Sequence, residues 1–171
     1  MRSGKGRMSS NILVLGIAVG IIAAQTSRDA APVSVQPLPF SHKIHAAQGL
    51  ACKDCHALPD PGDQAGLPSA SKCMSCHMTI AKDRPAIAKL AEFSKKQEPI
   101  PWKQVYRVQE YVAFSHKAHV GRARVDCQTC HGAVQERDVI RKEKSISMSA
   151  CMDCHRSNGA SVACDYCHEM K

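Results

Sequence analysis

Ten cysteines and nine histidines dominate the chemistry open to this chain of 171 residues. All ten cysteines fall into five copies of the pattern Cys-x-x-Cys-His, and none is left over. The copies are Cys52, Cys55 and His56; Cys73, Cys76 and His77; Cys127, Cys130 and His131; Cys151, Cys154 and His155; and Cys164, Cys167 and His168. Disulfide frameworks, zinc sites and covalently attached haem can all use cysteines at this density. Only haem attachment needs a histidine directly after every second cysteine, so the pattern predicts five covalent haem c groups.

In such a motif the two cysteines form thioether bonds to the haem, and the adjacent histidine ligates the iron. This spacing suits one helical turn, which presents both sulfurs and one imidazole to the cofactor. The sequence therefore predicts five proximal iron ligands, namely His56, His77, His131, His155 and His168.

The four remaining histidines are His42, His45, His116 and His119, and all of them lie in a repeated hexapeptide, Phe-Ser-His-Lys-x-His. It spans residues 40–45 and 114–119, and each copy shortly precedes a haem motif. Histidines three positions apart on a helical turn lie side by side, so each pair could reach two different haems. A single histidine is more often a surface or hydrogen-bonded residue, but this double placement favours four distal iron ligands.

Composition agrees with an interior filled by cofactors. Aromatic residues make up only 4% of the chain, too few for an ordinary side-chain core at this length. The formal charge of +8 is offset by about two propionates on each haem, or roughly ten acidic groups in total. The charge therefore gives no reason to expect a nucleic-acid partner.

The N-terminus carries an export pattern. Arg2, Lys5 and Arg7 precede an uninterrupted apolar run at residues 12–24. Because the bulky Ile22 makes a poor cleavage site, we expect residues 1–27 to remain as a single-span anchor in the inner membrane, with the haem domain on the periplasmic side. Removal of this segment as a signal peptide is the alternative.

The remainder divides by motif content. Residues 28–39 are proline-rich and form an expected extended tether, residues 40–81 a two-haem unit, and residues 114–171 a three-haem unit. The linker 82–113 contains a predicted helix at 85–96, with proline at its first turn, and the segment 106–114 alternates as an extended chain does. The expected fold class is mostly irregular, with short α-helices and little sheet.

Phe-Ser-His-Lys-x-His followed by Cys-x-x-Cys-His resembles the small multihaem cytochromes of the c7 and c3 families. The resemblance implies that His42 serves the haem at Cys52 and Cys55, and His45 the haem at Cys73 and Cys76. It likewise implies that His116 serves the haem at Cys127 and Cys130, and His119 the haem at Cys151 and Cys154. No histidine remains for the fifth haem. Met148 stands where c7 cytochromes carry that distal ligand, and a thioether ligand would raise the potential of this haem. Met148 could instead be a packing residue, and Met78 and Met170 are rival sulfurs.

The whole pattern is similar to the pentahaem cytochrome c subunit of alternative complex III, a bacterial quinol:electron-acceptor oxidoreductase. The similarity includes the N-terminal span, the two hexapeptides, the division into two and three haems, and Pro-Trp-x-x-Val-Tyr-x-x-x-x-Tyr-Val at residues 101–112. It implies an electron-relay subunit without substrate chemistry of its own. The implied partners are an iron–sulfur subunit, polytopic quinol-binding membrane subunits and a monohaem cytochrome c. The aromatic residues Trp102, Tyr106 and Tyr111 form either a docking surface or packing against haem edges.

Two other functions remain open from the sequence. The chain could be a free-standing periplasmic electron carrier or a subunit of another complex. A pentahaem reductase would need an open iron site and a substrate cavity, for which so short a chain has little room.

Overall fold

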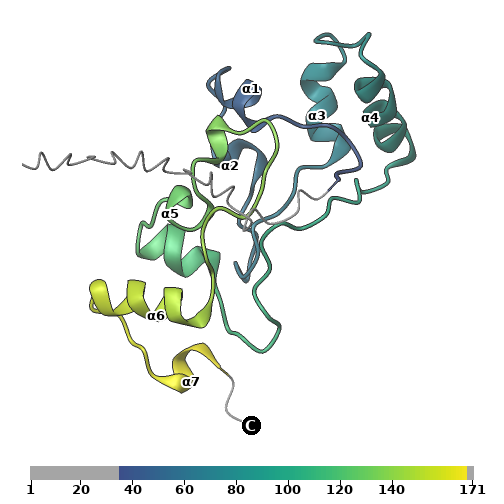
Figure 1. Ribbon diagram of the computed structural model, residues 1–171. Helices are drawn as coiled ribbons and strands as arrows, with labels where there is room; N and C mark the ends of the chain where they lie inside the picture. The colour runs from purple at the N-terminus through teal and green to yellow at the C-terminus, as the bar shows by residue number, and fades with distance from the viewer. Residues whose placement is uncertain (1–34, 169–171) are drawn as a thin grey trace, which may run out of the picture. The chain divides into compact units, whose positions relative to one another are not determined.

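The computed structural model describes residues 35–168 of the chain (Figure 1). The expected membrane anchor at 1–27 and residues 28–34 of the tether lie outside this range. No helix within residues 35–168 is long and apolar enough to cross a membrane.

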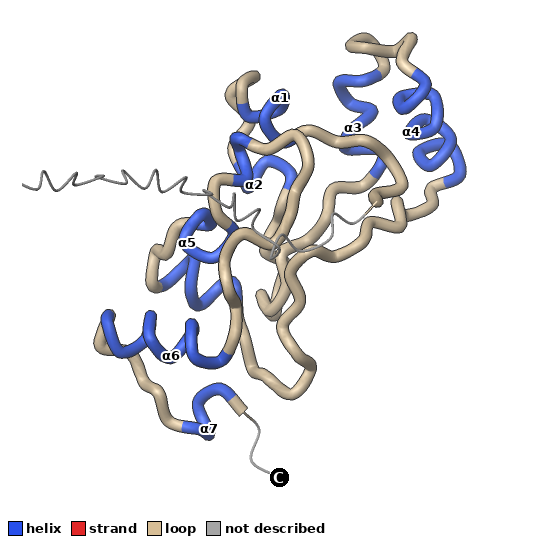
Figure 2. The backbone as a smooth tube through the Cα atoms, viewed as in Figure 1, coloured by secondary structure: helices blue, strands red, loops and turns tan. Residues whose placement is uncertain are grey.

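Short helices joined by long irregular segments make up the described chain (Figure 2). They are α1 (His42–Ala46), α2 (Cys52–Cys55), α3 (Ala70–His77), α4 (Pro85–Lys96), the π-helical turn η1 (Lys117–Arg122), α5 (Cys127–His131), the 3₁₀ turn η2 (Val134–Glu136), α6 (Met148–Ser157) and α7 (Cys164–Cys167). The β-structure within residues 35–168 is limited to an isolated antiparallel bridge between Val112 and His168. The predicted fold class is confirmed for these residues.

The helix predicted at residues 85–96 is confirmed as α4, from Pro85 to Lys96. Pro85 occupies the first turn, where its missing N–H is not needed. The helix ends because Gln97 adopts a left-handed conformation, with φ of 56°, and its N–H bonds to the last turn. Helix α4 lies beside α3, so this pair is the best-packed helical part of the described chain (Figure 1).

The side-chain core is small and confined to this region. Leu38, Ala70, Leu90 and Ile100 are the buried hydrophobic residues within 35–168, and no large side chain there is fully buried. An ordinary domain of this length buries many more aliphatic and aromatic side chains. Away from α3 and α4, backbone hydrogen bonds and groups other than aliphatic side chains must therefore hold the fold together.

The prediction of an extended segment at 106–114 is wrong for its second half. The chain turns there, with the N–H of Val112 donating to the carbonyl of Gln109 at 3.0 Å. After the turn, the N–H of Ala113 donates to the carbonyl of Cys167 at 2.8 Å, which ties the linker to α7. Alternating polarity alone did not reveal this turn, because its residues include neither glycine nor proline.

Candidate haem-binding sites

Each Cys-x-x-Cys-His motif forms or ends a helical turn, in α2, α3, α5, α6 and α7. The N–H of the motif histidine bonds back to the carbonyl of the first cysteine, at 2.9 Å from His56 to Cys52 and 3.0 Å from His168 to Cys164. This closure brings two sulfurs and one imidazole to the same turn. All ten cysteines lie within the described residues, where they are unpaired and at least partly exposed.

Each of four motif histidines faces one histidine of a hexapeptide. The ring centres lie 6.2 Å apart for His42 and His56, 6.1 Å for His45 and His77, 6.4 Å for His116 and His131, and 6.0 Å for His119 and His155. An imidazole nitrogen lies about 2.0 Å from a bound metal and about 1.1 Å from its own ring centre, so two imidazoles on one metal are about 6 Å apart. All four spacings fit one iron between the rings. The pairs are also those that the resemblance to c7 and c3 cytochromes implies.

The two hexapeptides use the same local contacts. Phe40 packs edge-on against His42 at 4.7 Å and stacks on His45 at 4.4 Å. Phe114 contacts His116 and His119 in the same two ways, at 4.8 Å and 4.7 Å. In both copies the serine hydroxyl accepts the N–H of the residue three positions later. The residues shared by the two copies therefore have structural roles: phenylalanine orients both imidazoles, and serine caps the turn that carries them.

Backbone carbonyls orient most of these imidazoles through Nδ1. The pairs are His56 with Gly66 at 2.9 Å, His77 with Ile80 at 3.0 Å, His155 with Ser161 at 2.6 Å, His168 with Tyr111 at 3.2 Å, His45 with Ser41 at 2.7 Å, His116 with Asp63 at 2.7 Å and His119 with Ser115 at 2.8 Å. A carbonyl oxygen only accepts, so Nδ1 carries the proton and Nε2 keeps its lone pair. This is the arrangement by which proteins prepare histidine as a metal ligand.

Two histidines differ from this pattern. The Nδ1 atom of His42 is buried without a hydrogen-bond partner. Burial, with His56 and His45 nearby, lowers the pKa of His42 to about 4, so the ring is neutral at physiological pH. His131 makes no hydrogen bond through its ring to any residue of 35–168, and it packs edge-on against Tyr106 at 4.6 Å. Burial also lowers the pKa of His131, with contributions from His116 and His56.

The fifth motif has a different neighbour. His168 lies beside Tyr111, with ring centres 5.9 Å apart and planes within 25°, and the carbonyl of the same tyrosine accepts from its Nδ1. Met148, the ligand expected from the sequence, is the first residue of α6 and is 64% exposed. Sequence reasoning did not assign Tyr111 to His168, since the two are 57 positions apart.

The known proteins that this chain resembles are c-type cytochromes. Residues 112–169 match the family of cytochrome c7 and related cytochrome c, and residues 19–97 match the class III cytochrome c family. The menaquinone reductase multihaem cytochrome c subunit of Nitratidesulfovibrio vulgaris is 32% identical over 162 residues, covering 78% of this chain and 77% of the relative. This chain belongs to the multihaem c-type cytochromes.

Two further relatives match less completely. The high-molecular-weight cytochrome c of the same organism is 25% identical over 69% of this chain but only 30% of its own length. A cytochrome c3 of Desulfuromonas acetoxidans is 39% identical over 33% of this chain and 79% of the relative. The two family matches divide the chain roughly where the two hexapeptide units divide it.

The attachment motifs of this cytochrome follow one another in space. Burial raises the pKa of four cysteine thiols, and in each case a thiol of another motif adds to the rise. The neighbours are Cys55 beside Cys73, Cys52 beside Cys127, Cys154 beside Cys130, and Cys167 beside Cys151. These electrostatic influences link the motifs in the order second, first, third, fourth and fifth.

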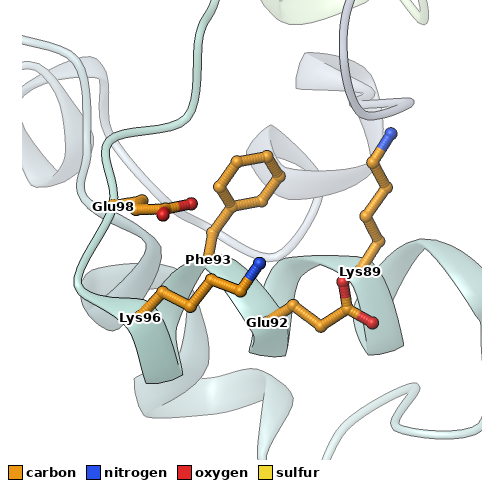
Figure 3. A pocket seen from close by; sticks show the side chains of 5 residues that line it. All are labelled: Lys89, Glu92, Phe93, Lys96 and Glu98. Carbon is orange, nitrogen blue, oxygen red and sulfur yellow. The ribbon is translucent and has the colours of Figure 1, made fainter.

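Two surface hollows of the cytochrome differ in their lining. One is lined by Phe114, His116, His119, Val120, Val125, Asp126, Cys127, Cys130 and His131, so it coincides with the third motif and its paired histidine. The other lies over the end of α4 and is lined by Lys89, Glu92, Phe93, Lys96 and Glu98 (Figure 3). It contains neither cysteine nor histidine, and the ammonium of Lys89 donates to the carbonyl of Pro37 at 3.0 Å. The candidate cofactor sites are therefore the motif–hexapeptide pairs.

Proposed function

We propose that this cytochrome carries five haem c groups and relays electrons as a subunit of a membrane-bound, quinone-linked oxidoreductase. Haem c, when bound, supplies an iron that alternates between the ferric and ferrous states and so takes up and releases single electrons. The observation that supports a relay is the set of four facing histidine pairs, with ring centres 6.0 to 6.4 Å apart, and the electrostatic influence between thiols of different motifs agrees with it.

The roles of the side chains in this proposal follow from the site geometry. The ten cysteines would hold the cofactors covalently, and each of the four histidine pairs would supply two nitrogen ligands to one iron. The pair spacings of 6.0 to 6.4 Å and the Nδ1 bonds to carbonyls support that role. Irons ligated on both sides have no open position for a substrate, so these residues support electron relay rather than chemistry on a substrate.

His168 and Met148 are the proposed ligands of the fifth iron. A methionine sulfur favours the ferrous state relative to an imidazole, so this position would have a higher potential than the others. The fifth motif stands at one end of the motif order, and the second motif, which lies within α3 beside α4, stands at the other. We propose that electrons enter at one of these ends and leave at the other.

The choice of a quinone-linked complex rests on the relative that is 32% identical over 78% of this chain, whose name describes a multihaem cytochrome c subunit of a menaquinone reductase. Alternative complex III, which the sequence pattern resembles, is also a quinone-linked complex. The partners implied by the resemblance to alternative complex III would be polytopic quinol-binding subunits, an iron–sulfur subunit and a monohaem cytochrome c. The N-terminal segment would anchor the cytochrome in the inner membrane, with its haem domain on the periplasmic side.

Purification from detergent-solubilised membranes tests this function. We expect the chain to carry five haems by intact mass, to co-purify with polytopic subunits, and to exchange electrons with a quinone pool in the same preparation. A five-haem chain recovered alone from the periplasmic fraction would instead identify a free-standing carrier. Fewer than five haems would contradict the assignment of all five motifs.

A further inference from the structure

Trp102 has a buried polar atom with no partner. Its Nε1 is one of two buried side-chain nitrogen or oxygen atoms within residues 35–168 that form no hydrogen bond; the other is Nδ1 of His42. An indole N–H can only donate, and buried donors are nearly always paired in folded proteins. A buried indole N–H therefore indicates an acceptor from outside the polypeptide of this region.

Hydrogen bonds hold the backbone around Trp102. The side-chain amide of Gln36 forms two hydrogen bonds with the backbone of Lys103, one donated and one accepted, each of 2.9 Å. The N–H of Trp102 itself donates to the carbonyl of Ile100 at 2.8 Å. These bonds hold the backbone at Trp102 and Lys103 in place.

The neighbours of Trp102 belong to the second haem site. The indole packs against the buried cluster of Leu38, Ala70, Leu90 and Ile100. Cys73, an attachment cysteine of the second motif, packs against the same cluster. The indole also meets Phe40 edge-on, with ring centres 6.3 Å apart. Phe40 in turn stacks on His45, which faces the second motif histidine, His77, and it also packs edge-on against His42, which faces the first. The buried cluster, through Cys73, is therefore what assigns Trp102 to the second motif.

We propose that Trp102 is a further cofactor-binding residue, and that its indole N–H donates a hydrogen bond to a propionate carboxylate of the haem attached at Cys73 and Cys76. This inference rests on the proposed haem content of the second motif. A carboxylate is the acceptor of choice because each haem c brings two of them, and a charge-assisted hydrogen bond is stronger than a neutral one. The indole would thereby disperse negative charge beside this iron and raise its potential above that of the same site without the donor.

Trp102 is the only tryptophan of the chain, which makes the test direct. Labelling the holoprotein with ¹⁵N-indole tryptophan gives a single indole N–H resonance. We expect this proton to exchange with solvent far more slowly than that of free tryptophan, and its resonance to move when the second haem is reduced. An indole proton that exchanges as fast as in the free amino acid, or that responds to none of the five reduction steps, would overturn the proposal.

A substitution tests the energetic consequence. In Trp102→Phe we expect one of the five reduction steps to move to lower potential, and this step should be the one that His45→Ala also alters. Tyr111→Phe is the matched control from the same linker and should leave that step in place. Unchanged potentials in Trp102→Phe would contradict the proposal. Haem stoichiometry, measured on the same samples, separates this failure from a failure of the five-haem assignment.

Discussion

The hydroxyl of Tyr106 joins three segments of the described chain, and its removal should cost measurable stability. It donates to the carbonyl of His131 at 3.3 Å and accepts the N–H groups of Glu143 and Lys144 at 2.8 and 3.2 Å. The ring itself lies edge-on to His131. Tyr106→Phe keeps this ring contact but deletes every hydrogen bond of the hydroxyl.

The size of the effect follows from these three distances. The bond from Glu143 is short enough to count in full, whereas the two longer ones are weak. A net contribution of about 0.5–1.5 kcal/mol per hydrogen bond, with some cost for the backbone groups left unpaired, gives about 2 kcal/mol for the group. At about 2–4 °C per kcal/mol for a chain of this size, the thermal midpoint should fall by about 4–8 °C.

Unfolding of the oxidised holoprotein in urea, followed by far-ultraviolet circular dichroism, measures this loss directly. Tyr111→Phe is the control, because its side chain is 69% exposed and its hydroxyl bonds to no residue of 35–168. The control should change the free energy of unfolding by no more than about 0.5 kcal/mol. Equal stability of Tyr106→Phe and the parent protein, or equal losses in both variants, would refute the reasoning.

Three further substitutions probe the proposed sites. His45→Ala should convert one of the five haems from low-spin to high-spin, since one iron loses its distal imidazole; electron paramagnetic resonance counts the converted irons, and an unaltered spectrum would exclude His45 as a ligand. Met148→Ala should abolish the separate high-potential step in a potentiometric titration, and persistence of that step would remove Met148 from the ligand set. Gly132→Ala should destabilise the protein by about 1 kcal/mol more than Gly49→Ala in urea titrations. Both glycines have positive φ, so both substitutions strain the backbone. Only at Gly132 would the new Cβ also meet Glu143, at 2.6 Å from its Oε2. Equal losses at the two glycines would show that this contact is relieved without cost.

The features predicted well from sequence are those fixed by neighbours in the chain. Helix α4 could be placed from its apolar spacing and from Pro85, because both act within a few turns. The motif turns and the hexapeptides follow the same logic: Ser41 caps a turn whose histidines lie three positions apart. The pairing of hexapeptide and motif histidines came from a resemblance to a family, and the ring spacings agree with it.

The features that sequence reasoning missed depend on partners far away in the chain. The carbonyl that orients His116 belongs to Asp63, and the one that orients His168 belongs to Tyr111. Backbone carbonyls are present at every residue, so sequence carries no mark of which one will be used. The turn from Gln109 to Val112 was missed for a related reason. It contains no glycine or proline, and the hydrogen bond that follows it, from Ala113 to Cys167 of α7, joins residues far apart in the chain.

The long-range bonds also explain how so small a side-chain core can suffice. The first hexapeptide is held by the second half of the chain: the N–H of Lys43 donates to the carbonyl of Arg137 at 3.1 Å. The second hexapeptide is held by the first half, with the N–H of Lys117 donating to the carbonyl of Gly62 at 3.0 Å. Each half thus fixes the turn on which the other half presents two histidines.

This reciprocity has an energetic consequence for the proposed cofactors. Backbone hydrogen bonds contribute little net stability when their surroundings remain wet, so the crossed contacts alone are weak. Cofactors held covalently by the cysteines of one segment, and bound through iron by histidines of another, would cover those contacts and close the loops between segments at the same time. The chain can therefore do without a large aliphatic core. The haems that would carry the electrons would also supply the buried surface that leucine and phenylalanine supply in other proteins, and they would cross-link the two halves of the chain.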